Sequence, residues 1–142
     1  MSRQLRLGPS AFGSKVACRG ADVATVVQIA AQYRPELTWY IADVDAMAVI
    51  DEELRSALPV RVGEATRMIE LASGISQFLD GVVLGARATI RFPAAGVSTS
   101  SERAETDADI EIRAFDTSYL QIDGRDESLL ERIATIVAAA HG

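Results

Sequence analysis

The chain is poor in the residues on which several kinds of catalytic chemistry depend. It has 142 residues, with a single cysteine, Cys18, and a single histidine, His141, which lies next to the C-terminus. One cysteine excludes an intrachain disulfide, and sites built from several histidine or cysteine ligands to a metal cannot form. Cys–His pairs and Ser–His–Asp triads are disfavoured for the same reason. We therefore predict neither a cofactor nor a metal site, and we interpret Cys18 as a small buried hydrophobic residue.

Long apolar runs are also missing. No run reaches the roughly 18 residues that a membrane-spanning helix needs. The N-terminal stretch MSRQLRLGPSAFGSK has no apolar segment of the kind that a signal peptide contains. We therefore expect a cytoplasmic protein with no membrane partner. Hydrophobic residues nevertheless make up 49% of the chain, which is enough for the core of one domain of common size, and we predict a single domain over residues 1–142.

Basic residues are outnumbered by acidic ones, and the net charge is −6. Residues 1–20 hold four basic residues and no acid. Residues 36–80 hold nine acids against three arginines, a net charge of −6, and residues 102–131 hold ten acids against three arginines, a net charge of −7. Because an acidic surface repels phosphate backbones, we expect no nucleic-acid partner. The acidic segments are either ordinary solvated surface or a means of steering a basic protein.

Hydrophobic periodicity predicts an α+β fold. We expect an antiparallel or mixed sheet of about four to five strands, with three main helices packed mostly on one face. Residues 1–20 are expected to be irregular apart from a short strand at 4–7, and the polar segment 93–107 is typical of a mobile loop. The other expected elements are helices at 22–34, with Asp22 as N-cap, at 64–75 and at 126–140, a helical turn at 51–54, and strands at 37–44 and 81–92.

Three strand-like stretches allow finer predictions. Residues 109–122 form either one long bent strand or a hairpin, and we favour the hairpin because Asp116 begins a turn-forming triplet. In residues 37–44 both faces are apolar, which predicts a central strand whose Trp39 and Ile41 anchor the core. The alternation in 81–92 predicts that one set of residues faces the helices: Val82, Leu84, Ala86, Ala88 and Ile90. It also predicts that Arg87 and Arg91 do not face the helices.

Acidic side chains follow the strand that carries Trp39. Asp43 and Asp45 continue the same face as Trp39, which predicts that they lie exposed at the rim of the sheet. With Asp116 they can divide general acid and base roles, or hold Mg²⁺ through oxygen ligands. However, the chain has no Gly-rich phosphate loop, no calcium-binding loop and no HExxH motif, and paired aspartates alone are a weak signal. We interpret them as acids at a strand end or turn.

Three segments together resemble a known class of proteins: TWYIADVDAM, GISQFLDGVVLGA and FDTSYLQIDGRDESLLERI. Their combination resembles small, single-domain bacterial proteins of the toxin-immunity type, which neutralise secreted toxins by binding them directly. The resemblance covers roughly a third of the chain. It implies that the protein has no active site and acts through a complementary surface. Many such toxins are basic, and acidic inhibitors associate with them faster because of electrostatic steering.

We therefore predict a non-catalytic protein-binding domain, and an immunity-type inhibitor of a basic protein toxin as its most specific form. The candidate partner-binding residues are Asp43, Asp45, Asp116 and Tyr119. The alternative hypothesis is a small-molecule-binding domain or a small enzyme, with an acidic pocket near Trp39, Asp43 and Asp116. A deep apolar pocket with converging polar groups at these residues would favour the alternative.

Overall fold

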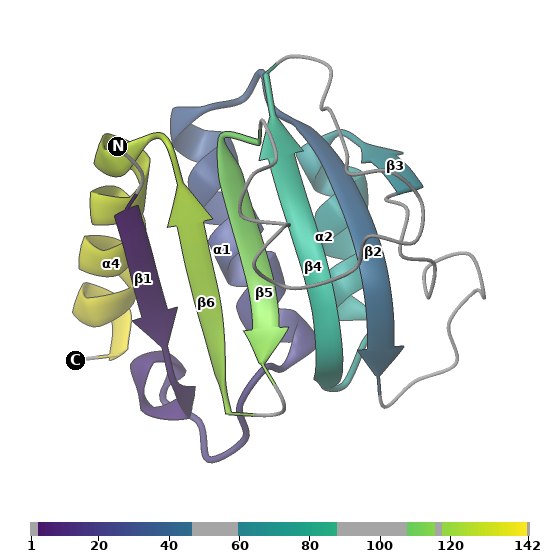
Figure 1. Cartoon of the computed structure of the whole chain (residues 1–142). Coiled ribbons are helices and arrows are strands. Elements are labelled where there is room, and N and C mark those ends of the chain that lie inside the picture. Colours follow the sequence, from purple (N-terminus) through teal and green to yellow (C-terminus); the bar gives the residue numbers. More distant parts are fainter. Residues whose placement is uncertain (1–2, 47–59, 88–107, 116–117, 142) are drawn as a thin grey trace.

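The computed structural model describes residues 3–46, 60–87, 108–115 and 118–141. In this part of the chain, six strands form one antiparallel sheet in the order β1-β6-β5-β4-β2-β3. The helices lie on one face of the sheet, with α1 between α4 and α2 (Figure 1). The strands are β1 (Arg3–Leu7), β2 (Thr38–Ala46), β3 (Val60–Gly63), β4 (Phe78–Ala86), β5 (Ile110–Phe115) and β6 (Tyr119–Gly124). The helices are η1, a 3-10 helix (Pro9–Phe12), α1 (Gly20–Tyr33), α2 (Ala65–Ser73) and α4 (Glu127–His141).

The predicted α+β class is confirmed, although the sheet has six strands rather than four to five. The strand that sequence analysis missed is β3, four residues long at the edge of the sheet. The hairpin at 109–122 is confirmed, because β5 and β6 are antiparallel neighbours. The short strand expected at 4–7 is β1, and residues 1–20 are more regular than expected only in that they also contain η1. The helical turn expected at 51–54 and the loop expected at 93–107 lie outside the described residues.

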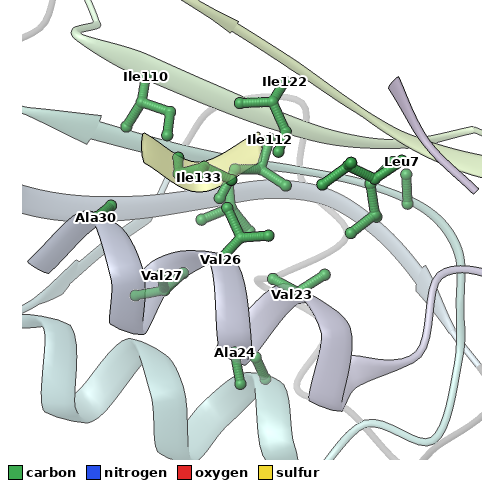
Figure 2. Close-up of a cluster of buried hydrophobic side chains, with 14 of the residues drawn as sticks. Leu7, Val23, Ala24, Val26, Val27, Ala30, Ile110, Ile112, Ile122 and Ile133 are labelled. Atoms are coloured by element: carbon green, nitrogen blue, oxygen red, sulfur yellow. The ribbon is translucent and has the colours of Figure 1, made fainter. Parts of the chain in front are cut away.

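The main core fills the space between the sheet and the helices. Apolar residues recur on one side of α1, so that helix presents a continuous stripe to the sheet. Figure 2 shows side chains of α1, β5, β6 and α4 in one cluster: Val23, Val26, Ile110, Ile112, Ile122 and Ile133. The prediction that Trp39 and Ile41 anchor this core is confirmed, because both side chains are completely buried.

The prediction for the faces of 81–92 is wrong within the described residues. Val83 lies in the main core under the helices, whereas three of the residues expected there form a separate cluster with Ala108 on the opposite face: Val82, Leu84 and Ala86. The reason lies in the glycines of β4. A Cβ at Gly85 would lie 3.1 Å from the Trp39 ring, so the glycine makes room for a large side chain of the core rather than marking a solvated face. The remaining residues of that prediction lie outside the described part of the chain, except Arg87, which is exposed.

The expected phase of β2 is also wrong beyond residue 42. The register with β4 shifts between Ala42 and Asp45, and Asp43 has a left-handed backbone conformation with φ of 53°. This β-bulge reverses the alternation. Val44 therefore turns into the main core, and Asp45 no longer continues the face of Trp39.

The first main helix begins slightly earlier than predicted. Its N-cap is Arg19, and Asp22 is the third helical residue rather than the cap. The Asp22 carboxylate nevertheless accepts a hydrogen bond from the backbone N–H of Arg19 at 3.2 Å and pairs with the Arg19 guanidinium at 2.7 Å. Asp22 thus stabilises the helix start from inside the first turn.

Candidate functional site

One end of the sheet carries four side chains in a single row across four strands. We call the sheet face turned away from α1, α2 and α4 the outer face. Asp45 of β2 is opposite Asp80 of β4. Asp80 is in turn opposite Phe115 of β5, and Phe115 is opposite Tyr119 of β6. Directly opposite residues of antiparallel strands project from the same face. These four residues, the end row, span about 14 Å at the usual strand spacing and lie at the lower end of the sheet in Figure 1.

The aromatic half of the end row is stacked between two arginines. The ring centroids of Phe115 and Tyr119 are 5.3 Å apart, with 24° between the ring planes. The guanidinium of Arg6 lies 5.0 Å from the centre of the Tyr119 ring, and that of Arg113 lies 5.6 Å from the centre of the Phe115 ring. Both aromatic residues are half-buried, so each is held in place and still presents surface. Tyrosine and arginine are enriched among the residues that dominate binding energy at protein interfaces.

The acidic half of the end row places two like charges opposite each other. Asp45 and Asp80 are both exposed. Asp80 accepts a hydrogen bond from the backbone N–H of Gly81 at 3.1 Å, and neither carboxylate has an arginine or lysine partner among the described residues. Like charges in directly opposite positions destabilise a sheet. By contrast, three other aspartates each pair with an arginine at 2.7–2.9 Å: Asp22, Asp109 and Asp126.

The neighbouring part of the outer face is polar but internally bonded. Asp123 accepts hydrogen bonds from the amides of Gln4, at 3.1 Å, and Gln121, at 3.0 Å. Glu111 and Arg113 lie 3.7 Å apart, and each side chain is only 7% exposed. The charge of Asp123 is therefore met by side-chain amide donors of β1 and β6, whereas Asp80 accepts a backbone N–H of its own strand.

The loop before α1 fastens the strands that carry the end row. The Cys18 thiol donates a hydrogen bond to the carbonyl of Tyr119 at 3.2 Å. The backbone N–H of Phe78, at the start of β4, donates to the carbonyl of Cys18 at 2.7 Å. The prediction that Cys18 is buried is confirmed. Burial raises the pKa of its thiol above the usual value, so Cys18 is a poor nucleophile and has a structural role.

The structure brings together two of the four candidate partner-binding residues. Asp45 and Tyr119 lie in the end row, Asp43 is the half-buried residue of the bulge, and Asp116 lies outside the described residues. Sequence reasoning missed Asp80 and Phe115. The signal that could have found them is the pairing of the hairpin: once Phe115 is opposite Tyr119, the partner of Phe115 on the next strand completes the row.

A second group of charged residues lies at the opposite end of the sheet, where α1 ends and α4 begins. Arg34 donates a hydrogen bond to Asp126 at 2.7 Å, and Asp126 accepts another from the backbone N–H of Leu129 at 3.1 Å, as an N-cap does. The Arg87 guanidinium pairs with Asp109 at 2.9 Å. Burial alone would raise the pKa of Asp126, but these hydrogen bonds and the charges of Arg34 and Arg87 hold it below its ordinary value. This group joins α1, α4 and the sheet.

The Asp126→Ala variant tests this structural role. We expect it to lower the free energy of unfolding by about 1–2 kcal/mol at neutral pH, because a cap and a partly exposed ion pair are lost together. Since the pKa of Asp126 is lowered by folding, its contribution is fully present above the ordinary value of 3.8 and is lost as the pH falls through the folded value. Urea unfolding of both proteins at neutral and acidic pH should therefore show a difference that shrinks on acidification. A difference independent of pH would contradict the ionic role.

Within residues 3–46, 60–87, 108–115 and 118–141, neither of the two hollows described includes Trp39 or Asp43, and Asp116 lies outside these residues. Trp39 is completely buried in the main core, so it cannot contact a ligand from solvent. Two shallow hollows lie elsewhere, one beside the Arg34–Asp126 pair and one between α1 and α4 that includes Tyr33 and Arg132. Among the described residues, no three His, Cys, Asp or Glu side chains are grouped so as to hold a metal ion. None of the described helices has the length and apolar character needed to cross a membrane.

Comparison with known proteins found no match to this chain among family models, curated proteins or solved structures.

Proposed function

We propose that this protein is a non-catalytic protein-binding domain that acts as an immunity-type inhibitor of a toxin, with the end row at the centre of its contact surface. The observation that carries the proposal is the stacked pair of Phe115 and Tyr119. It is half-buried, held between two arginines and placed beside two carboxylates that form no ion pair with any basic side chain among the described residues. Aromatic and arginine side chains in a fixed arrangement are the usual anchors of a protein interface.

Preorganisation of the end row supports this function. Its four residues project from neighbouring strands of one sheet, and the Cys18 loop ties the strand start at Tyr119 to that at Phe78. Side chains held in this way lose little conformational freedom when a partner binds, which lowers the entropic cost of association. Polar groups scattered on mobile loops would lack this advantage.

The proposed partner is a basic protein toxin, encountered in the bacterial cytoplasm. The resemblance of three sequence segments to toxin-immunity proteins supports this choice, as does the net charge of −6. The exposed carboxylates Asp45 and Asp80 add a local negative potential beside the aromatic pair. Such a potential accelerates association with a basic partner and discriminates against acidic proteins.

Affinity capture from cells of the source organism tests the proposal, with Tyr119→Ala and Tyr33→Ala as matched variants. Tyr33 is also half-buried and lies under an arginine, Arg132, at 4.4 Å, but it belongs to the helix layer. We expect quantitative mass spectrometry to identify a basic protein retained by the wild type and by Tyr33→Ala and depleted at least tenfold with Tyr119→Ala. That protein, expressed alone, should arrest growth, and co-expression of the wild-type chain should restore it. Retention by all three baits, or growth arrest without rescue, would contradict the proposal.

A further inference from the structure

Asp80, which the sequence analysis did not single out, lies opposite Asp45. Two arginines, Arg6 and Arg113, lie on other strands of the same face, but their guanidinium groups turn elsewhere. Arg113 is one row away on the neighbouring strand, since its register partner on β4 is Val82, but it turns toward the Phe115 ring at 5.6 Å. Arg6 turns toward the Tyr119 ring at 5.0 Å. Both guanidinium groups thus lie over the aromatic pair, and in the part of the chain that the structure describes neither carboxylate forms an ion pair with a basic side chain.

The bulge in β2 is what creates this opposition. Without the extra residue, Asp45 would lie on the same face as Trp39, as simple alternation predicts. With Asp43 in the left-handed region, Val44 enters the main core and Asp45 pairs with Asp80 on the outer face. A non-glycine residue in this conformation is itself unfavourable. Two locally unfavourable features, the strained bulge and the like-charge pair, thus coincide in the end row.

We propose that Asp45 and Asp80 together determine partner specificity by receiving a basic side chain of a partner segment that lies along the end row. The inference rests on the proposed function, and it adds that Asp45 and Asp80 are the residues that select a partner by its charge. Opposite strand positions lie about 5 Å apart, a separation at which two carboxylates can share one guanidinium or ammonium group. The apolar stem of that side chain, or its neighbour, then packs on Phe115 and Tyr119. Charge complementarity therefore selects a basic segment and rejects an acidic one.

The free protein provides the first test, without any partner. If the two carboxylates repel each other, Asp80→Asn should raise the melting temperature by about 1–4 °C at low ionic strength. The gain should disappear in 1 M salt, where the screening length is only about 3 Å. The double variant Glu36→Gln/Glu70→Gln, which removes two exposed acids outside the end row, should show no comparable gain. A lower melting temperature for Asp80→Asn at low salt would overturn the inference, because it would show that the carboxylate is held by stabilising contacts.

The second test uses an eight-residue peptide of alternating arginine and glycine, with a citrulline peptide of the same length as its neutral isostere. In titrations followed by amide NMR, the arginine peptide should shift the signals of the end row in the wild type. The citrulline peptide should not, and Asp45→Asn/Asp80→Asn should weaken the response at least tenfold. Glu36→Gln/Glu70→Gln removes the same net charge and should leave the response unchanged. Shifts spread over all exposed acids, or an equal loss in both double variants, would overturn the inference in favour of non-specific attraction.

Failure of this inference can be distinguished from failure of the proposed function. Suppose that Asp45→Asn/Asp80→Asn binds the captured protein as tightly as the wild type does, while Tyr119→Ala does not bind it. This result would show that the carboxylate pair does not determine specificity, but it would still agree with the end row as the contact surface. A captured protein retained by Tyr119→Ala would instead contradict the proposed function itself. The expected result is at least tenfold weaker binding for both variants, with a salt-dependent loss for the carboxylate variant.

Discussion

Gly20→Ala is expected to lower the free energy of unfolding by about 3 kcal/mol or more, at the upper end of the range for overpacking. Gly20 begins α1, and its backbone N–H donates a hydrogen bond to the carbonyl of Ile75 at 3.1 Å. A Cβ at this position would lie 2.0 Å from the carbonyl oxygens of Ala72 and Ile75. Because these obstacles are backbone atoms, α1 and the end of α2 must move apart, and urea denaturation should show the loss directly.

The sign of this effect separates packing from helix propensity. Alanine favours a helix over glycine by about 1 kcal/mol in an exposed helix interior, so propensity alone would predict stabilisation. Gly74→Ala is the matched control, since its Cβ would meet the nearest carbonyl oxygen at 3.6 Å, an ordinary contact, and it should change stability by no more than about 0.5 kcal/mol. A stabilised Gly20→Ala variant would contradict the close contact between the two helices.

Ile133→Ala is expected to lower the free energy of unfolding by about 2–5 kcal/mol, the usual range for truncating a buried isoleucine. Ile133 is completely buried and lies in the core cluster formed with α1 and the sheet (Figure 2). Ile136, one turn further along α4, is only partly buried, so Ile136→Ala removes the same atoms at a smaller loss. Urea denaturation of both variants should rank them in this order. An unchanged unfolding midpoint for Ile133→Ala would show that α4 does not pack as described.

Elements with one apolar face were predictable from local pattern. The apolar positions of the last helix are spaced three and four residues apart, and Leu129, Ile133 and Val137 are buried as that spacing requires. The strands of the C-terminal hairpin were predictable in the same way, from alternation and a turn-forming triplet. The facing of β4 was not, because both of its faces are buried. Gly85 makes room for the ring of Trp39. Because Trp39 is far away in the sequence, the local pattern of β4 does not reveal this role.

The candidate site was only half predictable, for a related reason. Asp45 and Tyr119 belong to conspicuous short segments, so they attracted attention by composition. Asp80 and Phe115 belong to the end row only through strand register, which no single segment encodes. The bulge at Asp43 adds one residue to the alternation and so changes the face on which Asp45 lies. The shift arises from the backbone conformation of Asp43, and no distinctive pattern in the neighbouring sequence predicts it.

The most direct test of the central claim, that the end row is the contact surface, is the affinity of the captured partner for Tyr119→Ala and Tyr33→Ala, measured by calorimetry. Both variants remove a half-buried tyrosine that lies under an arginine, one on the outer face and one on the helix layer. The account predicts at least tenfold weaker binding for Tyr119→Ala and unchanged binding for Tyr33→Ala. Unchanged binding for Tyr119→Ala with weakened binding for Tyr33→Ala would contradict it and place the contact surface on the helices.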